Sequence, residues 1–463
     1  MDVIRLFPGA ENLSVGHVAE WKNSAFCNTI EIGGKLHTRM YFDDLGAEKS
    51  LIKRYAKLTL YEILSERFDK QLPWGSLTGI RPTRLAYAEL ERGRDFRPLF
   101  EQLKVSKENT ELVAGVIEGQ QGIYERKEGN VDLYVSLPFC PSKCDYCSFI
   151  TAPIDKTRKY LSGYLSALAR ELEAAEPLIK NLRSVYVGGG TPFVLEPDEL
   201  EQVLKMIAPL RKNGSEYTIE AGRPDVFTRE KLDLCREYGV SRICINAQSF
   251  SDRTLAAIGR KHTRGQLFEA FEMARPYGFT INCDLIAGLT GESVEEFADS
   301  VEQAISFAPE NITVHTLCLK KGAKLKEEHL TEEQNPSVVP LAEGNLGEMI
   351  AYSRNALTKA GYEPYYLYRQ KYMAGAHENV GWTKRGYASV YNIDVMEEIA
   401  DNLAVGSNAI SKKLFLSEER IERLGSPKDI PTYLAKVEKI IEEKNELFGK
   451  SSRNSFSAPC KNL

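Results

Sequence analysis

Residues 134–149 read Tyr134-Val-Ser-Leu-Pro-Phe-Cys140-Pro-Ser-Lys-Cys144-Asp-Tyr-Cys147-Ser-Phe149. The three cysteines fall within eight residues, directly after a run of strand-forming residues. Three thiolates this close together can hold one corner of an iron–sulfur cluster, which leaves one iron open to a small chelating ligand. A zinc site completed by a distant His or Cys is the alternative. The spacing alone does not decide between these two metal centres.

The same segment begins a regular alternation of short β-rich runs and longer helical runs. Strands are expected over residues 131–137, 184–187, 217–220, 242–247, 280–286 and 312–317, and helices over 156–175, 197–211, 229–238, 251–258, 265–277 and 294–307. Six such units with short connections predict a parallel sheet with right-handed crossovers. The predicted fold class is α/β, as a full or partial TIM-type barrel or a doubly wound sheet.

Changes of pattern along the chain predict four segments. They are a small α+β domain at 1–128, the β/α core at 129–318, an α-rich substrate-covering domain at 319–448 and a disordered tail at 449–463. Residues 320–340 are polar and contain proline, as in a loop or lid. Residues 74–84 are rich in turn formers and cations, which suits either contact with an anion or a structural loop.

The composition is that of a globular protein. The chain has 463 residues, 43% of them apolar, and a formal net charge of −5, which argues against binding nucleic acid. No run is apolar and long enough to span a membrane, and residues 1–18 lack the apolar region of a signal peptide. We therefore expect a cytoplasmic monomer, not bound to a membrane, whose cysteines are reduced or bind metal.

A second motif stands where the next predicted strand ends, and reads Gly188-Gly189-Gly190-Thr191-Pro192. Consecutive glycines let the backbone approach a ligand closely, and exposed peptide groups can bind an amino or carboxylate group. A tight β–α turn is the other interpretation. In a parallel barrel the carboxyl ends of neighbouring strands meet, so this run would lie beside the cysteines.

Polar residues stand at comparable positions in three later strands, because Glu220, Gln248 and Asp284 each lie in or at the end of an apolar run. A buried carboxylate is costly unless it is paired. For each residue taken singly, a satisfied hydrogen bond in the core is the alternative. Since five successive β-units place polar or glycine elements at one rim, we predict an active site there.

Taken together, these motifs resemble those of the radical SAM superfamily, with Cys-x3-Cys-x2-Cys after Tyr-x3-Pro-Phe and Gly-Gly-Gly-Thr-Pro downstream. Over residues 131–317 the chain is most similar to the oxygen-independent coproporphyrinogen III oxidases and their relatives, the HemN, HemW and HemZ branches. Residues 74–84, 366–375 and 378–381 look most like the HemZ branch. The resemblance implies a partial (β/α)6 barrel.

The resemblance also implies the cofactors, a [4Fe–4S] cluster and S-adenosylmethionine. By position, the resemblance implies that Cys140, Cys144 and Cys147 bind the cluster and that Tyr134 is a catalytic tyrosine beside it. Gly189, Gly190 and Thr191 would contact the methionine moiety of S-adenosylmethionine. Glu220, Gln248 and Asp284 would contact its polar groups and ribose, and Arg260 would pair with its carboxylate. A surface arginine is the alternative for Arg260.

The implied reaction converts two propionates of the tetrapyrrole coproporphyrinogen III to vinyl groups, which gives protoporphyrinogen IX and requires a low-potential electron donor. Two positions depart from the decarboxylase pattern: Ser136 stands where His is common, and Phe149 where a fourth Cys is common. Because Cys-x2-Cys-x-Phe is shared with the heme-binding branch, a heme chaperone that keeps the cluster is the alternative. Residues 365–371, with Arg369 and Lys371, suit either a substrate pocket or a tyrosine-rich strand packed on the barrel.

Overall fold

The computed structural model describes residues 2–10, 12–22, 25–42, 49–79, 81–147, 152–211, 214–318, 343–370 and 376–450. The chain divides into two compact units, one of Met1–Glu118 with Leu367–Val380 and the other of Gly119–Tyr366 with Gly381–Leu463. Predictions about residues 320–340, the tail from 451 onward, Phe149 and Lys371 fall outside the described residues. Among the helices that the structure describes, none is both long and apolar enough to cross a membrane.

The first unit combines a small antiparallel sheet with helices. Its elements are β1 (Val15–Lys22), β2 (Ala25–Ile32), β3 (Lys35–Phe42), α1 (Lys49–Phe68), α2 (Pro82–Leu90), α3 (Arg97–Gln102) and α4 (Lys107–Gly119). The alternation in β2 turns Ile30 and Ile32 toward Leu60 and Leu64 of α1, where all four are buried. The alternating and helical stretches of the sequence therefore form the core of this unit.

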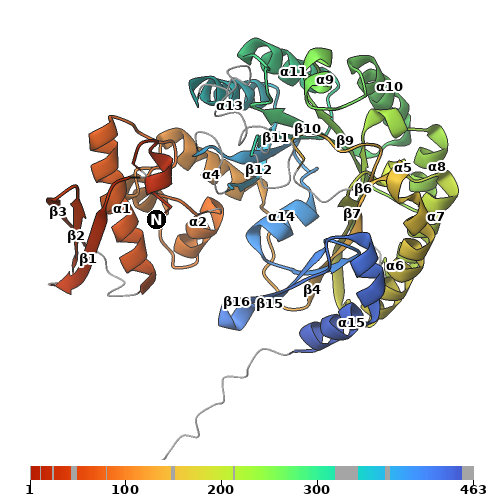
Figure 1. Ribbon diagram of the computed structural model, residues 1–463, viewed down its shortest axis with the longest axis horizontal. Helices are drawn as coiled ribbons and strands as arrows, with labels where there is room; N and C mark the ends of the chain where they lie inside the picture. The colour runs from red at the N-terminus through yellow and green to blue at the C-terminus, as the bar shows by residue number, and fades with distance from the viewer. Residues whose placement is uncertain are drawn as a thin grey trace, which may run out of the picture. The chain divides into compact units, whose positions relative to one another are not determined.

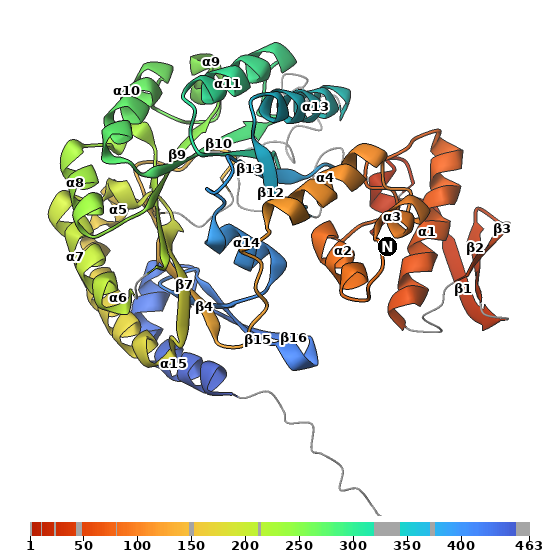
Figure 2. The ribbon, with the colours of Figure 1, turned by 180° about the vertical axis from the view of Figure 1, so that it is seen from behind.

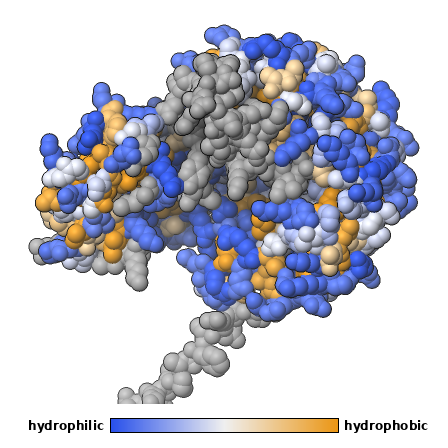
Figure 3. Space-filling view, viewed as in Figure 1, coloured by the Kyte–Doolittle hydropathy of each residue, from blue (hydrophilic) through white to orange (hydrophobic). Residues whose placement is uncertain are grey.

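The opposite face of the same sheet exposes large apolar side chains. Val18, Leu36, Met40 and Phe42 are all more than half exposed on β1 and β3, and orange residues gather over these strands at the left of Figure 3. Among the described residues, this sheet is covered on one face only.

The second unit is built on six parallel strands that neighbour one another in chain order. The strands are β4 (Asn130–Leu137), β7 (Asn181–Gly189), β8 (Glu216–Gly222), β9 (Arg242–Gln248), β10 (Thr280–Ala287) and β11 (Asn311–Thr316). The connecting helices are α6 (Leu161–Ala175), α7 (Pro197–Ile207), α8 (Arg229–Glu237), α9 (Asp252–Ala257), α10 (Arg264–Ala274) and α11 (Val294–Ser306). The predicted α/β fold class is confirmed.

These helices follow the outer side of the sheet, and α14 (Val390–Glu397) lies on its inner side (Figures 1 and 2). Local signals fix several helix starts, since α10 and α11 both begin with a capping box, from Thr263 to Gln266 and from Ser293 to Glu296. The apolar residues of α6, α7, α10 and α11 are buried, whereas the inner side of the parallel strands carries polar side chains.

The region after β11 differs from the α-rich segment that the sequence predicted. It contributes the helices α13 (Glu343–Lys359), α14 and α15 (Ile430–Gly449), but also the strands β12 (Glu363–Tyr368), β13 (Asn379–Thr383), β14 (Asp401–Val405), β15 (Ile410–Phe415) and β16 (Arg420–Gly425). All five strands join the parallel sheet, whose order is β12-β13-β11-β10-β9-β8-β7-β4-β14-β15-β16. The sequence prediction missed these strands, of which β15 and β16 lack the apolar runs of the core strands.

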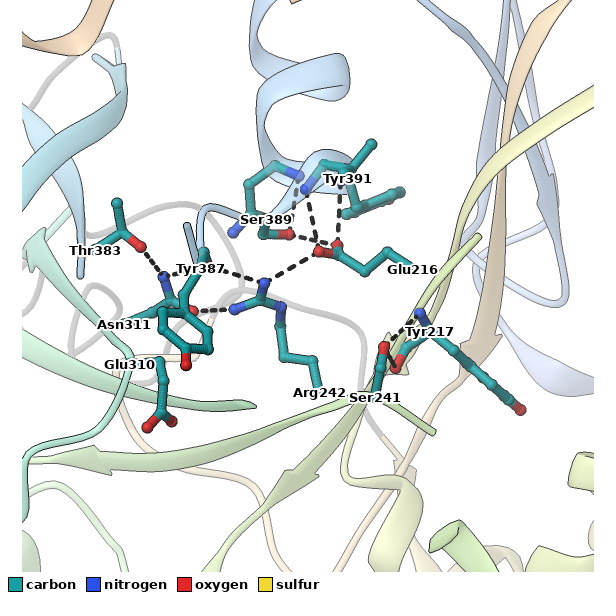
Figure 4. A network of polar contacts seen from close by, with 12 residues as sticks. Glu216, Tyr217, Ser241, Arg242, Glu310, Asn311, Thr383, Tyr387, Ser389 and Tyr391 are labelled. Atoms are coloured by element: carbon teal, nitrogen blue, oxygen red, sulfur yellow. Dashed lines mark hydrogen bonds and ion pairs between the residues drawn. The ribbon is translucent and has the colours of Figure 1, made fainter. Parts of the chain in front are cut away.

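A buried network joins α14 to the amino-terminal ends of the parallel strands (Figure 4). The Glu216 carboxylate accepts hydrogen bonds from the Ser389 hydroxyl at 2.8 Å and from the backbone N–H groups of Val390 and Tyr391 at 3.2 and 3.3 Å. It also pairs with Arg242 at 3.0 Å. Because a carboxylate satisfies the unpaired N–H groups of a helix start, Glu216 caps α14 from the sheet.

Candidate active site

Each of the six parallel strands has one polar, partly exposed residue in its carboxyl-terminal half, with buried residues before and after it. These residues are Tyr134, Tyr186, Glu220, Asn246, Asp284 and His315, on β4, β7, β8, β9, β10 and β11 in turn. Contacts between neighbouring strands join Tyr186 to Glu220 and bring Asp284 near His315 on the inner face. The predicted rim of polar groups thus includes Tyr134, Glu220 and Asp284, together with residues that the sequence did not single out.

Three stacked tyrosines line the β4 and β7 side of this inner face. The Tyr186 ring lies 4.4 Å from that of Tyr391 on α14 and 6.1 Å from that of Tyr134, centroid to centroid. The Tyr134 and Tyr391 rings are 6.2 Å apart, and all three pairs are within 24° of parallel. They form a stack of roughly parallel rings, which we call the tyrosine wall.

Glu220 stands next to the tyrosine wall. Its Oε1 accepts a hydrogen bond of 2.7 Å from the Tyr186 hydroxyl, and a Cβ on Gly188 would lie 2.8 Å from its carboxyl carbon. Burial raises the pKa of Glu220 to about 7, although hydrogen bonds from Tyr186 and from the Gly189 backbone favour the charged form. This carboxyl group therefore exchanges a proton near neutral pH.

Asp284 behaves in the opposite way. Burial disfavours its charge, but hydrogen bonds from His315, Asn282 and Thr313 outweigh that cost and hold the pKa of Asp284 below its ordinary value. The Asn282 amide donates to Oδ1 at 2.7 Å, and His315 Nε2 lies 3.9 Å from the same oxygen. The inner face thus carries one permanent anion and one carboxyl group that titrates near neutrality.

A pH profile can test the environment of Glu220. The native protein retains the Glu220 proton up to about pH 7, whereas an unfolded glutamate loses it near 4.5. The native state therefore becomes less stable as the pH rises through this window, and the neutral variant Glu220→Gln lacks this loss. We expect the variant to gain about 1–3 kcal/mol relative to the unsubstituted protein between about pH 5 and about pH 8, measured on cofactor-free protein by denaturant unfolding. If the unfolding free energies of the two proteins changed with pH in the same way, the buried environment of Glu220 would be contradicted.

The cysteine loop, residues 140–147, follows β4. Its first part pairs as β5 (Phe139–Cys140) with β6 (Ala152–Pro153), and Thr191 lies against it, with its hydroxyl 3.6 Å from the Cys140 sulfur. Further along, the Asp145 N–H donates to the Ile258 carbonyl at 3.0 Å and the Cys147 N–H to the Cys144 carbonyl at 3.0 Å. The loop is therefore held against the carboxyl ends of β7 and of the α9 segment.

The glycine run permits this close approach. A Cβ on Gly190 would lie 2.4 Å from the Phe139 carbonyl oxygen, and Gly189 has a φ of +97° with Ser136 Oγ only 2.8 Å from where its Cβ would be. Larger residues would clash with backbone and with buried side chains. The run therefore brings β7, the cysteine loop and Glu220 together, as predicted from its place at a strand end.

Gln248, at the end of β9, and Arg260, after α9, have buried polar atoms without a hydrogen-bond partner among the described residues. Gln248 ends β9 in the left-handed region, with φ +69°, and its buried Oε1 has no hydrogen-bond partner among the described residues. The Arg260 guanidinium donates to the Asn246 carbonyl and lies near Tyr146 and Cys144, while its buried Nε has no partner within the described ranges. Backbone strain and unsatisfied buried groups concentrate at functional sites.

Comparison with known proteins identifies this arrangement. A model of the radical SAM superfamily matches residues 134–304. The chain is 33% identical over 441 residues to the oxygen-independent coproporphyrinogen-III oxidase-like protein HemZ of Bacillus subtilis, covering 90% of this chain and 86% of that protein. The chain belongs to this radical SAM family. Its cofactors are accordingly a [4Fe–4S] cluster and S-adenosylmethionine.

Two further relatives complete the comparison. The heme chaperone HemW of Bacillus subtilis is 28% identical over 330 residues, covering 61% of this radical SAM chain and 85% of HemW. The solved structure of the coproporphyrinogen III oxidase HemN from Escherichia coli is 20% identical, has a TM-score of 0.54 and covers 72% of this chain and 73% of HemN. The likeness to HemN shows the shared fold.

The family assignment supersedes the zinc alternative, because a radical SAM protein binds a [4Fe–4S] cluster. In such a cluster each cysteine binds a different iron.

The structure also shows how the tyrosine-rich segment 365–371 packs, as far as its residues are described. Tyr365 and Tyr366 are buried in β12, where Tyr366 donates to Thr313 Oγ1 at 3.2 Å. Arg369 donates to the carbonyls of Leu77 and Ala376 and lies 5.1 Å over the Trp74 ring. These residues therefore pack the sheet and the loop at 74–84, as the structural interpretations of both segments predicted.

Sequence reasoning missed four residues of the inner face, of which Asn246 lies in an apolar strand as His315 does. His315 carried the same signal as Glu220 and Asp284, a polar residue in an apolar strand, and could have been found. Tyr186 and Tyr391 carried none, because tyrosine is common in strands and helices, and Tyr391 reaches the site from a helix far along the chain.

Proposed function

We propose that this chain is an oxygen-independent coproporphyrinogen III dehydrogenase, which converts two propionates of coproporphyrinogen III to vinyl groups and yields protoporphyrinogen IX for heme biosynthesis. The observation that carries the proposal is the 33% identity to HemZ along nine-tenths of the chain. The inner face supports the proposal because the tyrosine wall lies beside two carboxyl groups. The pKa of Glu220 is raised to about 7, whereas that of Asp284 is lowered. We expect the reaction in the cytoplasm, where thiols stay reduced.

Cys140, Cys144 and Cys147 are the proposed cluster ligands. Three thiols in one eight-residue loop match the donor set of a cluster with an open iron. Thr191 Oγ1, 3.6 Å from the Cys140 sulfur, is placed to hydrogen-bond a bound thiolate, and Arg260 adds a positive charge beside Cys144. Hydrogen bonds and charges of this kind tune the reduction potential of a cluster.

S-adenosylmethionine is the proposed ligand of the unused polar atoms near the loop. Gly189, Gly190 and Thr191 present backbone at the carboxyl end of β7, and Gln248 and Arg260 offer the buried Oε1 and Nε atoms that lack partners among the described residues. Glu220 and Asp284 would receive its amino and ribose groups. These residues fit an amino acid joined to a nucleoside, which needs both donors and acceptors.

When bound, the cluster and S-adenosylmethionine supply the radical that takes a hydrogen atom from a substrate propionate. That propionate then loses carbon dioxide and one electron to leave a vinyl group, so an electron acceptor is needed as well as the low-potential donor. The tyrosine wall would pack against the flat tetrapyrrole and orient it, with Tyr134 nearest the cysteine loop. Glu220 would hold or release a proton as the charge of its neighbours changes.

An anaerobic assay tests the proposal. Reconstituted protein with S-adenosylmethionine, a strong reductant and coproporphyrinogen III is expected to form one 5′-deoxyadenosine for each vinyl group. Formation of 5′-deoxyadenosine with coproporphyrinogen left intact would show that the substrate is wrong while the cofactor site is right.

Ser136 favours a second candidate, a heme-binding chaperone. Its hydroxyl donates to the Ser407 carbonyl at 2.8 Å, and it is enclosed by Gly189 and Gly406. The larger His that is common in decarboxylases would not fit there without moving β14 or the glycine run. Stable, stoichiometric heme binding without decarboxylation would support the chaperone, which the similarity to HemW also favours.

A further inference from the structure

One buried arginine next to the cysteine loop has no role in the site described above. Arg223 directly follows β8 and is 2% exposed. Its Nε and Nη2 donate to the two carboxylate oxygens of Asp225 at 2.9 and 2.6 Å. This two-bond geometry fixes the plane of the guanidinium group and supplies the charge that its burial requires.

The remaining end of this guanidinium contacts the cysteine loop. Nη1 of Arg223 donates to Ser142 Oγ at 2.5 Å, and Ser142 lies between Cys140 and Cys144. The preceding residue, Gly222, has a φ of +76° and would place a Cβ 3.0 Å from the Thr191 methyl group. This turn therefore brings the end of β8 directly against the loop.

Different contacts hold the two halves of the loop. The later half is held by the Asp145 N–H on the Ile258 carbonyl and by the Cys147 N–H on the Cys144 carbonyl. In the earlier half, residues 141–143 belong to no helix or strand, and Ser142 there receives the Arg223 hydrogen bond. Loss of that bond would loosen the segment that separates two thiols.

We propose that Arg223 is a positioning residue, which Asp225 orients and which fixes the cysteine loop through Ser142 before the cluster binds. Holding the thiols near their final places reduces the ordering that cluster binding must impose. The proposal rests on the cluster-binding role of the loop under the proposed function, and is independent of the substrate.

The first test uses the mild substitution Ser142→Ala in the full chain. In cofactor-free protein we expect amide hydrogen exchange over residues 140–147 to become about tenfold faster, as loss of a hydrogen bond to a charged group implies. In reconstituted protein we expect a similarly faster loss of the cluster to an iron chelator. The matched control is Ser166→Ala, whose hydroxyl donates to Ser162 on the exposed surface of α6, and both rates should stay unchanged.

The second test combines Ser142→Ala with Arg223→Lys, which keeps the charge and loses the fork. If both residues act through one bond, the double variant should be no faster than the faster single variant. Additive effects, or an unchanged loop in Ser142→Ala, would overturn the proposal. If Arg223→Lys does not fold, Ser142→Ala still decides. If the unsubstituted protein binds no iron but Ser142→Ala still speeds exchange in the loop, the cluster site is refuted. Arg223 then remains a residue that positions the loop.

Discussion

Replacing Cys144 with alanine is expected to lower the iron content of anaerobically reconstituted protein from about four atoms per chain to background. Cys144 is the middle cysteine of the loop and is buried beside Arg260. Two remaining thiolates cannot hold a cluster against chelators, so sulfide content and visible absorbance should fall with the iron. Formation of 5′-deoxyadenosine should disappear as well. Iron and sulfide analysis of the purified variant checks the prediction.

Cys235→Ala provides the matched control for this substitution. Cys235 is fully buried on α8, and burial raises the pKa of its thiol well above the ordinary value. It is therefore a packing residue, and we expect its replacement to leave the iron content unchanged. Full iron content in Cys144→Ala would contradict the cluster assignment, whereas loss in both variants would indicate a general effect on folding.

Arg242→Met is expected to lower the free energy of unfolding by about 3–5 kcal/mol, because it leaves the buried Glu216 carboxylate without its cation. In Figure 4 the Arg242 guanidinium lies between Glu216, the Asn311 amide oxygen and the Tyr387 carbonyl. The Arg242 and Glu216 side chains are only 7% and 10% exposed. Denaturant unfolding followed by circular dichroism measures the loss.

The control is Arg253→Met, which removes an arginine from an exposed pair. Arg253 contacts Glu296 at 2.5 Å, but its side chain is 61% exposed. Water solvates both charges there, so we expect a much smaller loss than for Arg242→Met. Equal losses of unfolding free energy in the two variants would show that burial of the Arg242–Glu216 pair does not determine how much the pair stabilises the fold.

The sequence predicted the β/α core well because the residues within each of those strands are enough to mark it as a strand. Strands of a parallel sheet are covered on both faces and read as short apolar runs between amphipathic helices. The strands β15 and β16 carry residues such as Lys412, Lys413 and Glu422 near the edge of the sheet, so no such run marks them. Their pairing is decided by neighbours far away in the chain, which no local pattern contains.

In the site, too, some residues could be predicted from the local sequence and others could not. Glu220, Gln248 and Asp284 could be predicted because a polar residue in an apolar strand is costly and therefore has a purpose. The orientation of Arg260 toward the cysteine loop, the tyrosine wall and the contact from Arg223 to Ser142 depend on how separate turns meet. Each of these needed coordinates, since residue type and spacing do not specify which turns come into contact.

The position of β14 has a consequence for synthesis of the chain. Val131 of β4 pairs with Asp401 of β14, a residue 270 positions later. While the ribosome is still translating the intervening residues, β4 keeps one edge open, with unpaired N–H and carbonyl groups that could join another chain. Messages truncated before residue 401 would therefore yield aggregation-prone products, because the open edge of β4 stays uncovered until β14 emerges.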